Sequence, residues 1–445
     1  MKNNLRRGML ALCAVICILL AVSGCRVGVP SDVPSDVTSD VPSDDAAAAA
    51  VTAAPSAAQS LPGAQDPTEP VSDAPETEAP AAAGAEAPAD ADLTAALDAV
   101  AARYGCSAAQ VGIIDGSGSV RYYSCGTMDA DGTRPVGRDS KFRCASLSKL
   151  VIGMTAMALQ EQGRFDINTD VGQILGFAVR NPSYPDTPIT AKMLMTHTSS
   201  LADGEAFLAS RNSASSEPLS SLLHNGGNYC GYRPGTAYTY SNFGAAVLAA
   251  ALEKATGTGF GTLADQLLFE PLGITAAFSA ADLPDVSQVA ALHSGGGTIW
   301  SVERQLRETP SGTLGQTHHL YQGNLTISAA DYAKLLGLLL SDGAYAGRQI
   351  LSKSSVEEIA MQHIESGGVR QGYFVEINEP SFADGDTVLT HTGSNYGMYS
   401  SFAVDRARGL GVVVFTGGAS ASLNARDGLY DVCDEMISLC FGRSE

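Results

Sequence analysis

Basic residues are scarce in this sequence of 445 residues: Lys and Arg number 27 against 47 Asp and Glu, which gives a formal charge of −20 at pH 7. No stretch or candidate helix is rich in Lys and Arg, which argues against nucleic acid as a partner. A long internal repeat is also lacking, which excludes the collagen, coiled-coil and solenoid classes. The part of the sequence from Leu93 to the C-terminus has about 350 residues, enough for one large domain or two closely joined ones.

The apolar segment near the N-terminus is too short for a transmembrane helix. Met9–Val22 is a charge-free run of 14 residues, whereas a helix needs about 20 residues to cross the hydrocarbon core. Three basic residues precede the run, which is the form of an export signal. The run ends in Val-Ser-Gly before Cys25, which resembles the bacterial lipobox. We therefore expect a lipoprotein signal peptide over residues 1–25, with Cys25 as the site of lipid attachment; an ordinary signal peptide is the alternative.

Residues 26–92 have few large apolar side chains and are rich in Ala, Pro, Ser, Asp and Glu. They hold 13 acids, one base and 10 of the 20 prolines. Such a segment cannot offset the entropy lost on ordering, so it is expected to stay disordered and extended. The sequence thus predicts a signal peptide (1–25), a disordered tether (26–92) and a domain (93–445), exported and anchored to the outer face of a bacterial membrane.

Strand-like segments occur near both ends of the domain, with helical segments between them. The strand candidates are Gln110–Asp115, Ser119–Cys125, Tyr399–Val404 and Leu410–Phe415. The helix candidates are Asp92–Arg103, Leu147–Gln162, Thr190–Met195, Asn242–Ala255, Ala329–Leu340 and a last helix over 429–437. These patterns predict an α+β fold, in which an antiparallel sheet is flanked by N- and C-terminal helices and a mostly helical second lobe forms a cleft with it.

Six of the nine cysteines lie in the domain, at positions 106, 125, 144, 230, 433 and 440. Six thiols allow 15 pairings, and the sequence does not choose among them. Cys433 and Cys440 are seven residues apart in a helix candidate, hence about 10.5 Å apart along the axis, which is too far for a disulfide. We expect most of the six to be small buried residues, with at most one disulfide.

The strongest chemical motif is Ser-Leu-Ser-Lys, from Ser146 to Lys149, at the first turn of a helix candidate. The spacing puts both side chains on one face. The amine can take the hydroxyl proton that a serine nucleophile must lose, and the helix N-terminus favours an oxyanion there. A lysine beside the apolar run Leu150–Met154 is costly unless it has partners. The alternative is a helix cap at the surface with no catalytic role.

Two further motifs follow along the chain. Tyr240 and Asn242 form a Tyr-x-Asn pair at a turn before a helix candidate. A tyrosine beside a lysine can act as a general base, and an asparagine offers a donor and an acceptor to a substrate amide; a packing tyrosine and a helix cap are the alternative. His391-Thr392-Gly393 precedes the C-terminal hairpin, where glycine lets a substrate backbone approach a strand edge.

Other residues that could carry chemistry have simpler interpretations. Cys144 is expected to be a small buried residue, because Ser146 and not the thiol has the neighbouring lysine. His197 is expected to serve packing and hydrogen bonding. His318 and His319 lack the spacing of a metal site, so no metal is predicted.

These motifs, in this order, resemble the serine β-lactamase and penicillin-binding-protein superfamily. The middle motif, Tyr-Ser-Asn ending at Asn242, resembles the class C β-lactamases, their DD-peptidase relatives and related esterases. Leu194–Leu201 is similar to the family segment LLTHTSGL, with Ser200 in place of the usual glycine. The resemblance extends over nearly all of Leu93–Gly442.

The resemblance implies a role for each matching residue. Ser146 would be the nucleophile, with Lys149 and Tyr240 sharing the work of base and proton shuttle. Asn242 would orient the substrate amide. The backbone N–H groups of Ser146 and Ser394 would form the oxyanion hole, while His391, Thr392 and Gly393 would bind the substrate. No metal, nucleotide or other cofactor is implied.

The function expected from this resemblance is hydrolysis through an acyl-enzyme. A D-Ala-D-Ala carboxypeptidase-like or D-amino-acid peptidase comes first; an esterase, a class C-like β-lactamase and a non-catalytic penicillin-recognising protein are the alternatives. His391 stands where β-lactamases of this group usually have lysine, and imidazole is charged only below a pKa near 6.5. Slow β-lactam hydrolysis is therefore expected. The partners would be a peptide or ester substrate and the membrane, with a monomeric domain.

Overall fold

The computed structural model describes residues 84–212, 217–294, 297–395 and 397–442. The predictions for the signal peptide, Cys25 and most of the tether lie outside these residues. No helix within the described ranges is long and apolar enough to cross a bilayer. The structure below is that of the unit from Pro80 to Glu445, as far as it is described.

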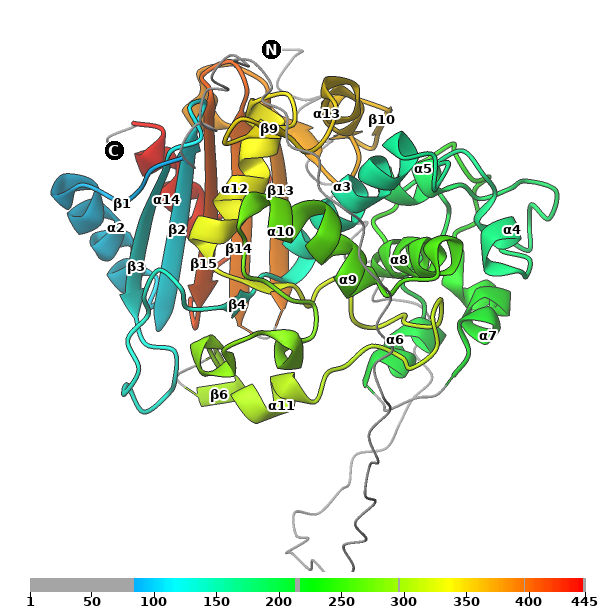
Figure 1. Ribbon diagram of the computed structural model, residues 1–445, viewed down its shortest axis with the longest axis horizontal. Helices are drawn as coiled ribbons and strands as arrows, with labels where there is room; N and C mark the ends of the chain where they lie inside the picture. The colour runs from blue at the N-terminus through cyan, green and yellow to red at the C-terminus, as the bar shows by residue number, and fades with distance from the viewer. Residues whose placement is uncertain (1–83, 213–216, 295–296, 396, 443–445) are drawn as a thin grey trace, which may run out of the picture. The chain divides into compact units, whose positions relative to one another are not determined.

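A nine-stranded sheet forms the core of this unit (Figure 1). From one edge to the other, its strands are β1 (Glu86–Pro88), β3 (Val120–Gly126), β2 (Ala108–Asp115), β15 (Leu410–Gly417), β14 (Met398–Asp405), β13 (Val388–Asn395), β12 (Glu376–Asn378), β11 (Val369–Gln371) and β10 (Ile364–Ser366). All neighbours are antiparallel except β1 and β3. Because β2 pairs with β15, the prediction that strands from both chain ends share one sheet is confirmed.

Each face of the sheet packs against helices, because successive side chains along a strand point to opposite faces. On β15, Val413 and Phe415 face the cluster that contains α12 (Ala329–Leu340), while Val412 and Val414 face α2 (Ala91–Arg103) and α14 (Asp431–Cys440). In Figure 1, α12 crosses the near side of the sheet. The central strands are therefore buried on both faces, which explains why β15 is an almost uninterrupted apolar run.

The second lobe is mostly helical, as predicted, and lies beside the β13 side of the sheet (Figure 1). Its helices are α3 (Ser148–Glu161), α4 (Val171–Leu175), α5 (Ala191–Met195), α6 (Glu205–Asn212), α7 (Leu219–His224), α8 (Asn242–Thr256), α9 (Phe260–Ala264) and α10 (Glu270–Leu272). Helix α8 begins where Ser241 accepts a hydrogen bond from the Gly244 N–H, and it ends at Gly257, which has a left-handed conformation. These are the usual start and stop signals of a helix.

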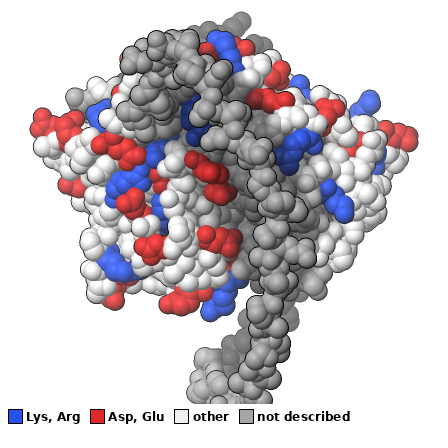
Figure 2. Space-filling view, in the orientation of Figure 1, with Lys and Arg blue, Asp and Glu red and all other residues white. Residues whose placement is uncertain are grey.

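The remaining elements are short. They are β4 (Phe142–Arg143) with β7 (Thr326–Ile327), β5 (Leu292–Ser294) with β6 (Gly297–Trp300), β8 (Ala344–Tyr345) with β9 (Arg348–Gln349), β16 (Leu423–Asn424) with β17 (Leu429–Tyr430), α11 (Val302–Leu306) and α13 (Lys353–Ala360). On the face shown in Figure 2, basic and acidic side chains are interspersed where the residues are described.

The ordered domain begins earlier than the predicted boundary at Leu93. Strand β1 pairs with β3, and α2 already starts at Ala91. Glu86 is held by ion pairs to Arg138 at 2.7 Å and to Lys334 at 3.0 Å. The prediction of a disordered segment is therefore wrong for these last residues before Leu93, because backbone pairing and charge partners compensate for the small side chains. All six cysteines of the domain are free thiols.

Candidate active site

Ser146 lies in a short 3-10 turn, Ala145–Leu147, that leads directly into α3. Ala145 has a φ of +50°, a conformation that costs about 1–3 kcal/mol outside glycine and is concentrated at functional sites. The turn is held from both sides. The Ser148 hydroxyl donates to the Ala145 carbonyl at 2.6 Å and accepts from the Leu325 N–H at 3.0 Å. The serine side chain is left partly exposed.

Lys149 is completely buried and its Nζ has three partners. It lies 3.0 Å from Ser146 Oγ, 2.8 Å from Asn242 Oδ1 and 2.8 Å from the carbonyl oxygen of Gln322. Three N–H groups of an ammonium match three acceptors. Two of these acceptors, an amide oxygen and a backbone carbonyl, cannot donate. If Nζ loses a proton, its lone pair therefore faces the Ser146 hydroxyl, the one partner that can donate.

Burial lowers the pKa of Lys149 to about 7, an effect that the charge of Asp203 opposes and that of Arg211 reinforces. Removing the ammonium from water disfavours the charged form. A substantial fraction of Lys149 is then neutral near pH 7, as a general base requires.

Tyr240 has the opposite electrostatic bias. Burial raises the pKa of its phenol well above the usual value, while a hydrogen bond with Ser146 counteracts part of this effect. The ring lies 5.1 Å from Lys149 Nζ and 4.5 Å from the ring of His197. The structure thus brings Ser146, Lys149 and Tyr240 together, with a neutral phenol beside an easily deprotonated amine.

Asn242 is the first residue of α8, and both ends of its side-chain amide are engaged. Its Oδ1 accepts from Lys149, and its Nδ2 donates to Asp203 Oδ2 at 2.6 Å. Asp203 also accepts from the Phe243 N–H at 2.9 Å. In this structure Asn242 orients Lys149. Asp203 and the Gln322 carbonyl were missed by sequence reasoning, because neither has a local spacing relative to the motifs.

Strand β13 brings the third motif against the Ser146 turn. A Cβ on Gly393 would lie 2.4 Å from Ser400 Oγ and 2.9 Å from both the Cys144 carbonyl oxygen and the Ser146 nitrogen. Only glycine permits this approach. Strand β12 pairs with β13 only as far as Thr390. Within the described residues, the backbone beyond Thr390 therefore has a strand edge with no neighbouring strand.

His391 lies on β13 and is 5% exposed. Its Nδ1 is 2.7 Å from the Thr392 carbonyl oxygen, so Nδ1 carries the proton. Burial, with a contribution from the charge of Lys149, lowers the pKa of His391 to about 3. Its imidazole is thus neutral at physiological pH. Thr392 is partly exposed and Ser394 is exposed, at the end of the strand next to Ser146.

Two of the simpler interpretations agree with the geometry. His197 is buried, accepts from the Ser241 N–H at 3.2 Å and packs on the rings of Tyr240 and Phe374. Cys144 is buried, and burial raises the pKa of its thiol to about 12. A thiol with so high a pKa is a poor nucleophile.

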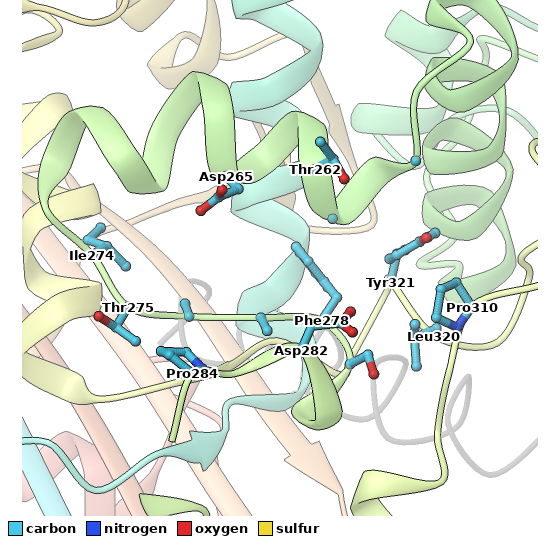
Figure 3. Close-up of a pocket in the computed structure, with 15 residues that line it drawn as sticks. Thr262, Asp265, Ile274, Thr275, Phe278, Asp282, Pro284, Pro310, Leu320 and Tyr321 are labelled. Carbon is cyan, nitrogen blue, oxygen red and sulfur yellow. The ribbon is translucent and has the colours of Figure 1, made fainter. Parts of the chain in front are cut away.

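A separate cavity of about 490 Å³ lies between α9 and the segment 274–284 (Figure 3). Its lining includes Asp265, Phe278 and Tyr321. None of the candidate catalytic residues lines it, so the cavity is distinct from the Ser146 site.

Comparison with known proteins identifies relatives over most of the domain. The family model described as Beta-lactamase matches residues 93–431. The chain is 29% identical to Penicillin-binding protein 4* of Bacillus subtilis over 36% of this chain and 35% of that protein. It is 25% identical to Penicillin-binding protein 4 of Amycolatopsis lactamdurans over 64% of this chain and 74% of that protein. It is 30% identical to the D-alanyl-D-alanine-carboxypeptidase/endopeptidase AmpH of Escherichia coli K12 over 36% of this chain and 42% of that protein. For the first and third relatives, the chain spans less than half of their length.

Solved structures share the fold. The octameric penicillin-binding protein homologue from Pyrococcus abyssi has a TM-score of 0.62 and 20% identity, over 79% of this chain and 77% of that one. The class C β-lactamase from Rhodobacter sphaeroides has a TM-score of 0.58 and 18% identity, over 79% and 98%.

Proposed function

Since this chain belongs to the beta-lactamase family of serine hydrolases, we propose that it hydrolyses peptide or ester bonds of D-amino-acid substrates through an acyl-enzyme on Ser146. One observation carries the proposal: buried Lys149 lies 3.0 Å from Ser146 Oγ, and its two other partners can only accept. The relatives named as penicillin-binding proteins and as a carboxypeptidase/endopeptidase support the peptide class of substrate.

Acylation starts with neutral Lys149 taking the proton of Ser146. The serine oxygen forms a bond to the substrate carbonyl carbon, and the backbone N–H groups of Ser146 and Ser394 hold the resulting oxyanion; loss of one such donor costs on the order of 10²–10³ in rate. The C–N or C–O bond then breaks, and the leaving group takes a proton from the neutral phenol of Tyr240. Lys149 returns its proton to Tyr240, so both side chains regain their starting protonation and the net result is the transfer of one proton from Ser146 to the leaving group.

Deacylation reverses these roles. A water molecule gives one proton to the Lys149–Tyr240 pair and adds its oxygen to the acyl carbon. The bond to Ser146 Oγ breaks, the serine oxygen regains the proton, and the product acid leaves. The high pKa of Tyr240 and the low pKa of Lys149 favour this division of labour, with the amine as base and the phenol as proton carrier.

A panel of substrates tests the proposal. D-Ala-D-Ala peptides, short acyl esters of D-amino acids and a chromogenic cephalosporin would be offered to the purified protein and to a Ser146→Ala variant. We expect peptide or ester turnover that the variant loses and that exceeds cephalosporin turnover. Neutral His391 supports this expectation, because it offers no permanent charge to the carboxylate of a β-lactam. A cephalosporin turned over faster than any peptide or ester would contradict it.

The alternative of a non-catalytic penicillin-recognising protein has less support. Such a protein would need neither a lysine hydrogen-bonded to the serine nor a lysine with a lowered pKa, and this chain has both features. We also propose that the protein is exported and held at the outer face of the membrane through a lipidated Cys25, because the short apolar run and the lipobox-like sequence precede an acidic tether.

A further inference from the structure

Glu376 lies on the strand next to β13, and its carboxylate has no cationic partner within the described part of the chain. It begins β12, opposite Thr390 of β13. No Lys, Arg or His in the described ranges lies within ion-pair distance of it. Its Oε2 is 3.5 Å from Asn378 Nδ2, which donates a shorter bond of 2.7 Å to Thr390 Oγ1. The carboxylate is therefore half-buried with only a weak partner, although burial raises its pKa.

A second polar group beside Glu376 is also incompletely paired. Gln371 on β11 is the cross-strand neighbour of Glu376, so the two side chains share a face of the sheet. Gln371 is 1% exposed, and its Oε1 has no hydrogen-bond partner among the residues described. A buried acceptor without a donor is unfavourable by about 1–3 kcal/mol. An acceptor without a donor beside a carboxylate with only one long hydrogen bond suits a ligand that carries N–H groups.

The position of Glu376 relates these acceptors to the reaction. Burial is the main cause of the raised pKa of the Tyr238 and Tyr240 phenols, and the charge of Glu376 adds to it in both cases. Glu376 lies opposite the residue at which the unpaired edge of β13 begins. From Gly393 to Thr390 the strand advances about 10 Å at about 3.3 Å per residue. A substrate extended along this edge from Ser146 toward Thr390 would bring one of its ends to Glu376.

We propose that Glu376 and Gln371 form a leaving-group subsite that selects an amide or an ammonium and rejects a carboxylate. The inference rests on the proposed function and narrows it. Neutral His391 adds no positive charge at this end of the strand. The preferred substrates then are amides, esters or internal peptide bonds whose leaving group ends in a neutral or cationic nitrogen. A free C-terminal carboxylate is disfavoured, which separates the chain from a simple carboxypeptidase.

Three peptides with one acyl part test the proposal: acetyl-D-Ala-D-Ala with a free carboxylate, its primary amide and its 2-aminoethyl amide. The measurements are kcat/KM and, independently of turnover, protection of Ser146 from labelling by a fluorophosphonate. We expect both kcat/KM and the protection of Ser146 to decrease from the cationic to the neutral to the anionic peptide. The kcat/KM values of the cationic and anionic peptides should differ about tenfold, as for a partly screened charge pair. Added salt should narrow the difference, because it screens partly exposed charges.

Glu376→Gln keeps the shape and the Asn378 contact, and it should bring the three peptides to within about twofold of one another. The control Glu270→Gln removes the same charge from an exposed position on α10, outside the proposed subsite, and should leave the order unchanged. An anionic peptide that binds as well as the cationic one, an order that persists in Glu376→Gln, or no protection by any peptide would overturn the subsite. Absence of fluorophosphonate labelling at Ser146 would instead overturn the proposed function.

Discussion

Lys149 is the residue on which the proposed chemistry depends, and its protonation can be followed by pH. With a pKa of about 7, the base is protonated and inactive below that value. The kcat/KM for an uncharged ester should rise about tenfold per pH unit below pH 7 and level off above it. A profile that is flat between pH 5 and 9 would contradict Lys149 as the base.

Asp203 allows a test of the direction in which a nearby charge shifts the pKa of Lys149. Its negative charge raises the pKa of Lys149, so Asp203→Asn should move the midpoint of the pH profile to lower pH. The asparagine can still accept the hydrogen bond of Asn242 Nδ2. Asp265→Asn, at an exposed position of the helical lobe, is the matched control and should leave the midpoint in place. A midpoint that stays the same or rises in Asp203→Asn would show that Asp203 does not act through Lys149.

Tyr240 carries the proton to the leaving group in this account. Tyr240→Phe removes the hydroxyl and keeps the ring contact with His197, so folding should be retained while kcat falls by about 10²–10⁴. Combined with Lys149→Ala, the loss should be far from additive, because both changes disable the same step. Steady-state rates of the single and double variants check both expectations, and thermal unfolding shows whether each variant is folded. Near wild-type turnover of Tyr240→Phe would exclude the phenol from the proton path.

At the scale of single residues, the sequence reveals those with a local signal. Ser146 and Lys149 are one helical turn apart, so their contact follows from spacing alone. Asp203, Glu376 and the Gln322 carbonyl reach the site from distant segments. Their positions depend on tertiary packing, which no spacing in the sequence encodes.

Strand β13 is the element that brings the proposed substrate-binding edge against the turn that contains Ser146. Gly393→Ala would place a methyl group 2.9 Å from the Ser146 nitrogen, so either the strand or the turn must move. We expect a stability loss of about 1–3 kcal/mol, together with strongly slowed acylation. Gly137→Ala is a suitable control, because a Cβ there has no heavy atom within 4 Å. Unchanged fluorophosphonate labelling of Gly393→Ala would contradict this role of the close contact.

Elements with a clear hydrophobic period were predictable, and those without one were not. The long helices and the strands β2, β3, β14 and β15 follow from apolar patterns. Strands β10, β11 and β12 have three residues each, too few for an alternation to be recognised. Strand β13 was expected only as the lead-in to a hairpin, because its Thr, Gly and Ser residues are not typical of buried strands.

At the scale of the whole molecule, the fold class could be predicted because strands near both ends of the chain must pair across a helical middle. The sheet order could not, since it depends on short edge strands. The start of the domain was misplaced because Glu86 finds Arg138 and Lys334, which lie far along the sequence.

The proposed membrane anchor is a hypothesis about the whole chain. Cys25→Ala should release the protein from the membrane fraction or block its maturation, because the lipid can no longer be attached. Stable anchoring requires more than one acyl chain, so a multiply acylated cysteine is expected. Fractionation and N-terminal sequencing check this. Wild-type protein found wholly soluble, with an N-terminus other than Cys25, would refute the anchor.

The central claim is that Ser146 is the acylated nucleophile, and mass spectrometry of the protein after exposure to benzylpenicillin tests it most directly. The account predicts one penicilloyl group per chain, mapped to the peptide that contains Ser146, absent from Ser146→Ala and lost only slowly. A folded protein that forms no adduct at Ser146 with either benzylpenicillin or a fluorophosphonate, or an adduct that persists in Ser146→Ala, would contradict it.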